Sequence, residues 1–258
     1  GIICPLILLE NFSTAVILFG VVFIMMFIGR VSIKRLGILA GAILMTIILG
    51  IGAIKAIPQE KMPKAFDRAY TWTARIDRFT ENTDDEESKY EITDENRQVQ
   101  HGRIAIARGG IFGVFPGNSI ERDYLPQAYS DFIYAIIVEE MGLVGGIFVI
   151  LLYLILLFRA GRIATESPTV FPAVLVIGLS LMIVIQSFVS MSVATSLGPV
   201  TGQPLPLISR GGTSILITCI YFGIIFGITR PLKEEGQPVD ETMDEKKEDK
   251  IPVVTLDE

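Results

Sequence analysis

The chain has 258 residues, of which 50% are hydrophobic and only 19% are charged, and its mean hydropathy is +0.53. Soluble domains ordinarily carry about 25% charged residues, so this composition excludes a water-soluble globular enzyme and indicates a polytopic membrane protein. The 22 basic and 28 acidic residues give a formal net charge of −6. This acidic balance argues against a protein that binds nucleic acid through a general positive field.

Apolar stretches long enough to cross a bilayer recur along the chain. A spanning helix needs roughly 20 residues, and the sequence predicts spans at about residues 14–28, 36–57, 132–158, 171–194 and 213–228. Residues 1–9 are apolar but too short to span, and they carry neither an initiator Met nor a basic stretch. We interpret them as the end of a preceding helix rather than a signal peptide, so the chain is expected to be the carboxy-terminal portion of a larger membrane protein.

Basic residues in the turns between the spans predict the orientation. Three turns carry them: Arg30, Lys34 and Arg35 after the first complete span, Arg159 and Arg162 after the third, and Arg230 and Lys233 after the last. Because spans alternate in direction, these turns should share one side, which the positive-inside rule makes cytoplasmic.

The chain is therefore expected to divide into four parts. Residues 1–57 hold the partial span and two complete ones, and residues 58–131 form a large extracytoplasmic loop. Residues 132–230 hold three spans with a Gly/Pro-rich outer loop at 196–212. Residues 231–258 are dense in Asp, Glu and Lys and lack aromatic residues, so they predict a disordered cytoplasmic tail.

The second half of the large loop differs from its highly charged first half. Residues 103–108 predict a short interfacial helix that runs into a glycine-rich turn at 109–119. Glycine lets a backbone approach a ligand or another helix closely, and the apolar side chains of the turn indicate that it dips to the membrane surface. A purely structural turn is the alternative.

Three carboxylates stand at the beginning of the span that follows. Asp131 lies where that helix should begin, so its structural interpretation is an N-cap. The functional interpretation, which is compatible with the first, is a carboxylate held at the membrane face that takes a proton from a hydroxyl nucleophile. Glu139 and Glu140 lie about two turns deeper, and ionisable residues inside a span are functional candidates by default. Glu139 would share a cavity wall with Asp131, whereas a structural carboxylate bonded to a neighbouring helix is the alternative for either glutamate.

The outer loop at 196–212 contains three prolines and four glycines, so it cannot form a regular helix. Irregular backbone at membrane depth is tolerated where protein buries it or where it lines a wet cavity. Arg210 in such a place calls for an anion, which is either a partner carboxylate or a phosphate. His101 is the only histidine, and since no nucleophile motif accompanies it, we interpret it as a bystander.

Taken together, these segments resemble the SEDS family of bacterial cell-wall glycosyltransferases, and its cell-division branch more than its elongation branch. The matching stretches are residues 109–113, 117–119, 124–126, 130–137, 139–142 and 202–214. The resemblance implies an all-α, polytopic membrane fold of ten spans, of which this chain covers the last five and the end of the preceding one. It also implies polymerisation of lipid II outside the cytoplasmic membrane during septal cell-wall synthesis.

The resemblance implies that Asp131 is the general base, which deprotonates the acceptor sugar 4-hydroxyl while the donor loses its lipid pyrophosphate with inversion. The predicted substrate-binding residues are Arg108, Asn118, Ser119, Gln203, Ser209, Arg210, Gly211 and Gly212, with Glu139 and Glu140 as further cavity acids. Arg210 or Arg108 is expected to hold the pyrophosphate. A few cations or a divalent metal, Mg²⁺ or Mn²⁺, would neutralise the growing charge, and no metal ligand is assigned.

The implied partners are a class B penicillin-binding transpeptidase and other division proteins, beside the lipid bilayer itself. This sequence departs from the family at several positions: Asn11–Thr14 replaces a Pro-Asp-Leu-Gly-Thr stretch, and Arg210 stands where Tyr is common.

Two other functions remain open at this point. A lipid II flippase would share the substrate without bond chemistry, but its carboxylates would follow a path through the midplane, whereas Asp131 is expected at the outer face. A non-catalytic scaffold for the transpeptidase predicts that Asp131→Asn leaves function intact.

Overall fold

The computed structural model describes residues 7, 11–56, 96–125 and 128–235, and every regular element within these ranges is an α-helix. In chain order the helices are α2 (Phe12–Ile28), α3 (Ile33–Ala56), α5 (Arg97–Gly109), α6 (Glu121–Tyr124), α7 (Ile133–Glu166), α8 (Val170–Ala194) and α9 (Gly212–Glu235). The predicted all-α fold is confirmed for this part of the chain. The charged half of the large loop and residues 236–258 of the predicted tail lie outside the described residues.

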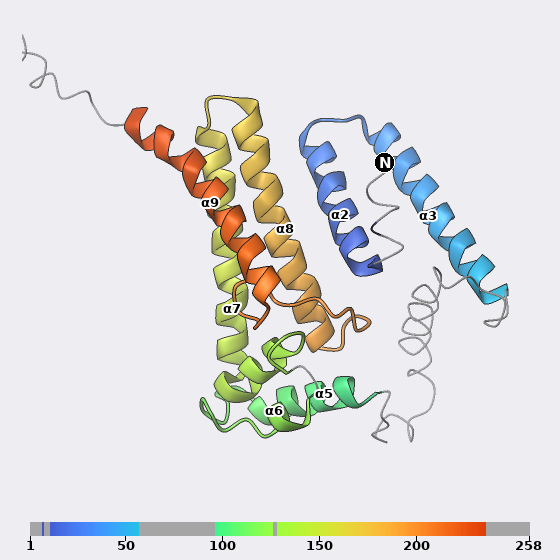
Figure 1. The fold of residues 1–258 in the computed structure, drawn as a ribbon, viewed down its shortest axis with the longest axis vertical. Helices are drawn as coiled ribbons and strands as arrows, with labels where there is room; N and C mark the ends of the chain where they lie inside the picture. The colour runs from blue at the N-terminus through green and yellow to red at the C-terminus, as the bar shows by residue number, and fades with distance from the viewer. Residues whose placement is uncertain (1–6, 8–10, 57–95, 126–127, 236–258) are drawn as a thin grey trace, which may run out of the picture.

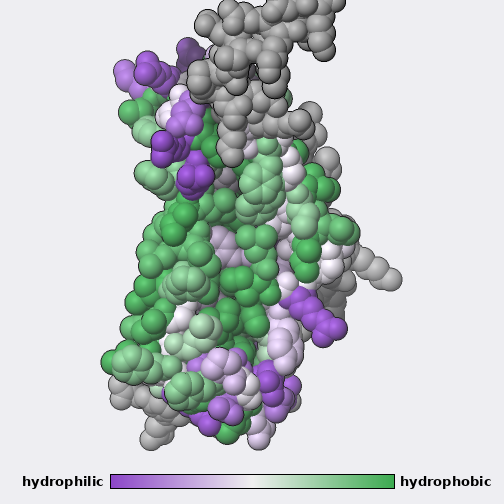
Figure 2. Space-filling view, turned by 90° about the vertical axis from the view of Figure 1, so that its left-hand side faces the viewer, coloured by the Kyte–Doolittle hydropathy of each residue, from purple (hydrophilic) through white to green (hydrophobic). Residues whose placement is uncertain are grey.

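Three helices are long and apolar enough to cross a membrane within the described ranges: α7, α8 and the part of α9 up to Thr229. Helix α2 is apolar over its 17 residues but shorter, and α3 has 24 residues. On the face that Figure 2 shows, apolar side chains form a broad belt across the middle of the molecule, between more polar ends. Such a belt is costly in water and is typical of lipid contact, so the chain is a multi-pass membrane protein.

Two helices extend beyond the predicted spans. Helix α7 continues past Phe158 to Glu166, so the basic residues Arg159 and Arg162 lie in its last turns instead of in a connection. Arg162 Nε donates to Glu166 Oε1 at 3.0 Å, an i,i+4 pair that supports a helix end. Helix α9 continues to Glu235, past the predicted start of the tail at Pro231, because the residues after this proline are good helix formers.

The long helices stand side by side (Figure 1). Helices α7 and α8 are antiparallel and make the most extensive contact, α9 crosses them, and α2 packs on another side of α8. The α2–α3 turn, the α7–α8 turn and the C-terminal end of α9 all lie at one end of the molecule (Figure 1). The three turns predicted to share one side therefore do share it.

The opposite end carries the elements of the site. Helices α5 and α6 lie across the beginning of α7 and the end of α8 (Figure 1). Phe132 is buried there, and its ring lies against Gly102 of α5, where a Cβ would come within 3.2 Å of it. Burying such a ring stabilises the fold by roughly 1.5–3 kcal/mol. The loop that joins α8 to α9 (residues 195–211, the α8–α9 loop) reaches the same end.

Candidate functional site

Asp131 lies in the turn that leads into α7, and its side chain is partly exposed. Ser130 Oγ donates to Asp131 Oδ1 at 2.8 Å. The prediction that Asp131 caps α7 is wrong, because the N-cap is Phe132 and no side chain bonds to the helix end there. Phe132, whose ring is buried, is the residue at the N-cap position. The Asp131 carboxylate is therefore not bonded to the end of the helix.

The α8–α9 loop passes next to this carboxylate. A Cβ added to Gly202 would lie 3.6 Å from Asp131 Oδ2, and Gly202 has a φ of +68°. Side-chain-bearing residues rarely adopt this conformation. The glycine therefore gives the chain its turn and leaves space beside Oδ2.

Several bonds anchor the α8–α9 loop. Three helices supply side chains to it. Thr14 of α2 accepts from Gln203 Nε2 at 3.2 Å, and Gln186 of α8 donates to the Pro204 carbonyl at 3.3 Å. Tyr153 of α7 donates to the Pro206 carbonyl.

The turn before α7 supplies two more contacts to the loop. Ser209 Oγ donates to the Ser130 carbonyl at 2.6 Å, and the Arg210 N–H donates to the Tyr129 carbonyl at 2.8 Å. The loop is non-helical, as predicted, and protein contacts satisfy much of its backbone.

The predicted substrate-binding residues of this loop fall into two groups. Gln203 and Ser209 are buried and bonded within the protein. Arg210 is exposed, and no partner of its guanidinium is found among the described residues. Gly211 and Gly212 lie where α9 begins, so Arg210 stands beside the positive end of a helix dipole, which favours an anion.

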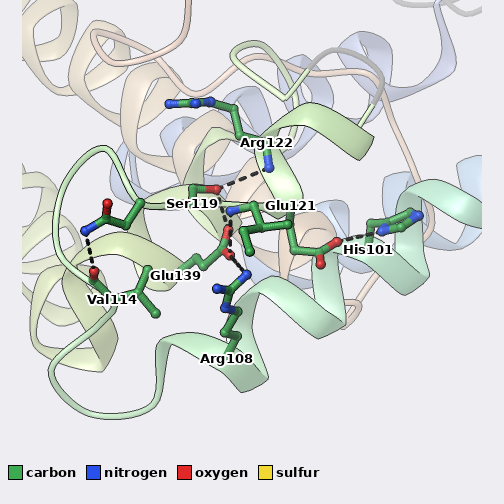
Figure 3. A network of polar contacts seen from close by, with 9 residues as sticks. His101, Arg108, Val114, Ser119, Glu121, Arg122 and Glu139 are labelled. Carbon is green, nitrogen blue, oxygen red and sulfur yellow. Dashed lines mark hydrogen bonds and ion pairs between the residues drawn. The ribbon is translucent and has the colours of Figure 1, made fainter.

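Glu139 forms the centre of a second polar cluster, which Figure 3 shows. Its carboxylate is completely buried. It accepts from Ser119 Oγ and from the Ile120 N–H, the latter at 3.2 Å, and it lies 3.5 Å from Arg108 Nη1. Two predicted substrate ligands, Ser119 and Arg108, thus contact Glu139. For Glu139 the geometry shows the structural alternative, a carboxylate bonded to a neighbouring helix.

The other polar residues of this region hold its turns together. Ser119 Oγ accepts from the Arg122 N–H at 3.2 Å, and Asn118 Nδ2 donates to the Val114 carbonyl at 3.0 Å. His101 Nδ1 lies 2.6 Å from Glu121 Oε2, and this contact joins α5 to α6 (Figure 3).

Glu140 differs from its neighbour Glu139. Its side chain is half-buried, and it contributes to the raised pKa of Arg122, whose largest cause is a hydrogen bond to Asp123.

The glycine turn (residues 109–117) packs backbone to backbone on α7. A Cβ on Gly109 would lie 2.0 Å from the Val138 carbonyl oxygen, and one on Gly113 would lie 2.2 Å from that of Glu140. No side chain fits at such distances. The close approach expected of these glycines is therefore made to another helix.

Helix α7 is interrupted where this contact occurs. Gly142 has φ 70° and ψ −172°, outside the helical region. The N–H groups of the next two residues find new acceptors: Leu143 donates to the Gly110 carbonyl at 2.9 Å and Val144 to the Ile111 carbonyl at 3.3 Å. Unpaired backbone groups are costly at membrane depth, and the glycine turn satisfies both.

The region combines a multi-pass helical bundle with a partly exposed carboxylate between transverse helices and a Gly/Pro-rich loop. The described side chains contain no group of three or more His, Cys, Asp or Glu residues that could hold a metal ion. This fold and site define a multi-pass membrane protein whose candidate functional residues lie at one end of its helical bundle. A family model described as cell cycle protein, FtsW/RodA/SpoVE, matches residues 2–234, and the chain belongs to this family.

Similar proteins support this membership. The probable peptidoglycan glycosyltransferase FtsW of Saccharophagus degradans is 34% identical over 244 residues, which cover 92% of this chain and 57% of that protein. Stage V sporulation protein E of Bacillus subtilis is 37% identical over 134 residues, 52% of this chain and 37% of that protein. The chain spans about half the length of the curated relatives that it matches.

A solved structure has the same fold. It comes from a peptidoglycan synthase complex described as coordinating polymerization and crosslinking. Its TM-score is 0.64 at 20% identity, over 89% of this chain and 59% of that chain.

Proposed function

We propose that this chain carries the catalytic centre of a peptidoglycan glycosyltransferase that polymerises lipid II, with Asp131 as its general base. The observation that carries the proposal is the partly exposed Asp131 carboxylate, held beside Gly202 at one end of the bundle. Two other carboxylates at this end are already engaged, since Glu139 contacts Arg108 and Glu121 contacts His101. Relatives named as probable peptidoglycan glycosyltransferases support the same activity.

The proposed reaction moves one proton and exchanges one bond. Asp131 takes the proton of the acceptor 4-hydroxyl, and the oxygen bonds to the anomeric carbon of the donor. The bond from that carbon to the lipid pyrophosphate breaks, and the pyrophosphate leaves with its electron pair. A positioned general base typically contributes 10²–10⁴-fold to such a step, and alignment of the two sugars contributes more.

Arg210 is the better of the two candidates for the pyrophosphate. Its exposed side chain stands beside the beginning of α9, where a charge-assisted bond and the helix dipole act together. Arg108 would have to give up its contact with Glu139. A Mg²⁺ or Mn²⁺ ion bound chiefly by pyrophosphate oxygens is the alternative way to neutralise this charge.

The proposal places Asp131 on the extracytoplasmic side of a bacterial cytoplasmic membrane. The basic turns at the opposite end of the molecule support this orientation through the positive-inside rule, and the tail after α9 would then be cytoplasmic. We propose a class B penicillin-binding transpeptidase as the partner, with other division proteins nearby. The similar complex, described as coordinating polymerization and crosslinking, supports such a pairing.

A flippase finds less support. Within α7, α8 and residues 212–229, acidic residues occur only towards the ends of α7, at Glu139, Glu140 and Glu166. A path of carboxylates through the midplane is therefore not present in these helices.

The decisive experiment feeds purified lipid II to the complete protein with its transpeptidase and measures glycan strands. Asp131→Asn should lower the rate by at least about 100-fold with normal folding and partner binding. Asp123→Asn is the matched control, because the Asp123 side chain is 74% exposed and pairs with the neighbouring Arg122. An unchanged rate for Asp131→Asn would favour the scaffold and end the enzymatic proposal.

A further inference from the structure

Ser209 is connected to the Asp131 carboxylate through Ser130, by two hydrogen bonds. Its side chain is only 3% exposed. Ser209 Oγ accepts from the Leu205 N–H at 2.7 Å and donates to the Ser130 carbonyl at 2.6 Å. Ser130 Oγ in turn donates to Asp131 Oδ1 at 2.8 Å.

The contact between the α8–α9 loop and the turn before α7 is double. Next to the Ser209 bond, the Arg210 N–H donates to the Tyr129 carbonyl at 2.8 Å. Two adjacent residues of the loop thus hold two adjacent residues of the turn. One bond would still allow the turn to rotate, whereas two fix both its place and its direction.

The part of the loop that carries Ser209 is itself firmly held. Leu205 is fully buried, and its carbonyl accepts from the N–H groups of Ser209 at 2.9 Å and Ile208 at 3.3 Å. Tyr153 fixes the Pro206 carbonyl from α7. Leu207, between these anchors, has a φ of 69°, a strained conformation for a residue with a side chain, and it persists only where its surroundings determine it.

We propose that Ser209 is a positioning residue that orients Asp131 for proton abstraction. This inference rests on the proposed function and replaces the sequence-based prediction that Ser209 binds substrate. The hydroxyl has one hydrogen, which goes to Ser130, and its burial keeps it away from a saccharide. Ser209 acts on the reaction through the turn that carries the carboxylate.

The expected signature follows from this indirect role. Misplacement of a reacting group by about 1 Å can cost about 100-fold in rate. Loss of the Ser209 hydroxyl should therefore lower kcat by about 10- to 100-fold and leave the KM for lipid II unchanged. A substrate-binding serine would instead raise KM.

The test compares Ser209→Thr, Ser209→Cys and Ser209→Ala in the complete protein with lipid II. The Thr variant keeps the hydroxyl donor, so its kcat should stay within about threefold of wild type. The Cys variant keeps the shape of the side chain but has only a weak donor, and it replaces the Ala variant if that variant fails to fold. Ser180→Ala is the matched control, since Ser180 is equally buried, lies in α8 and has an Oγ without a hydrogen-bond partner among the described residues. It should keep full activity.

Asp131→Asn separates this inference from the proposed function. If Asp131→Asn is inactive while Ser209→Cys and Ser209→Ala keep full kcat, the positioning role is wrong and the general base stands. If Asp131→Asn retains full activity, the proposed function itself fails. In an Asp131→Asn background, Ser209→Cys should cause no further loss, because there is no base left to orient; additive losses would overturn the inference.

Discussion

Arg108 Nη1 lies 3.5 Å from Glu139 Oε1, and this contact joins the end of α5 to the first part of α7. The Glu139 side chain is 0% exposed, whereas that of Arg108 is 36% exposed. A carboxylate removed from water is tolerated only when it is paired and hydrogen-bonded. Glu139 meets this condition with Arg108, Ser119 and the Ile120 N–H.

Replacement of Glu139 by Gln should destabilise the protein by about 1–3 kcal/mol, because the amide keeps the shape but loses the charge that Arg108 and Ser119 satisfy. A thermal unfolding midpoint in detergent measures this change. Glu140→Gln is the control, since Glu140 is half-buried beside it, and its effect should stay within about 0.5 kcal/mol. Equal losses of stability for both variants would show that the contacts of Glu139 stabilise the protein no more than a half-buried glutamate does.

Alanine at Gly113 should disrupt the contact between the glycine turn and α7. Its Cβ would lie 2.2 Å from the Glu140 carbonyl oxygen, at a φ of +79°. We expect a loss above about 4 kcal/mol, seen as a low yield of folded protein. Gly117→Ala isolates the conformational cost, because Gly117 has a φ of +88° and nothing within 4 Å of an added Cβ. That variant should lose only about 1–2 kcal/mol, and similar losses at both positions would contradict the steric explanation.

Arg210→Ala should raise the KM for lipid II or lower its rate of use by about tenfold or more, since a hydrogen bond to a charged group is worth about 1.5–3 kcal/mol. Steady-state polymerisation kinetics provide the measurement. Arg103→Ala is the control, because Arg103 is also exposed, lies on α5 and has no assigned role. Full activity of both Arg210→Ala and Arg108→Ala would refute the assignment of the pyrophosphate to these arginines.

The glycine turn should lie in the bilayer. Phe112 and Phe115 are 81% and 72% exposed, and they follow residues that contact the interrupted part of α7. In a protein whose single Trp72 is replaced by Phe, a tryptophan at position 112 should be quenched by lipids brominated on their acyl chains. A tryptophan at the exposed Asp123 should be quenched much less, and equal quenching would place the turn in water.

The spanning helices could be predicted from the sequence because their length is set by the bilayer and their composition by lipid. The interruption of α7 at Gly142 could not, since an isolated glycine in an apolar helix is a weak signal. Its cause is tertiary: Gly110 and Ile111, far back in the chain, supply the acceptors. The glycines of residues 109–113 were the available signal, and they indicated a close approach without naming its target.

The position of Asp131 at the end of the bundle was predicted correctly, but its capping role was not. Capping depends on a register of one residue, and the burial of Phe132 under α5 decides that register. The partners of Ser119 and Gln203 were likewise hidden, since Glu139 and Thr14 lie far from them in sequence. The anchors Tyr153 and Gln186 were missed, and their only signal was polarity within an apolar span.

The break at Gly142 has a mechanical consequence for the carboxylate. Val114 of the glycine turn donates its N–H to the Glu139 carbonyl before the break, and Leu143 and Val144 donate to the turn after it, so the turn bridges the two parts of α7. Asp131 lies in the turn before this helix, and the α8–α9 loop holds that turn through the bonds from Ser209 and Arg210. The carboxylate is therefore braced from two sides, by α5 with the glycine turn and by the α8–α9 loop, although the helix that follows it is broken.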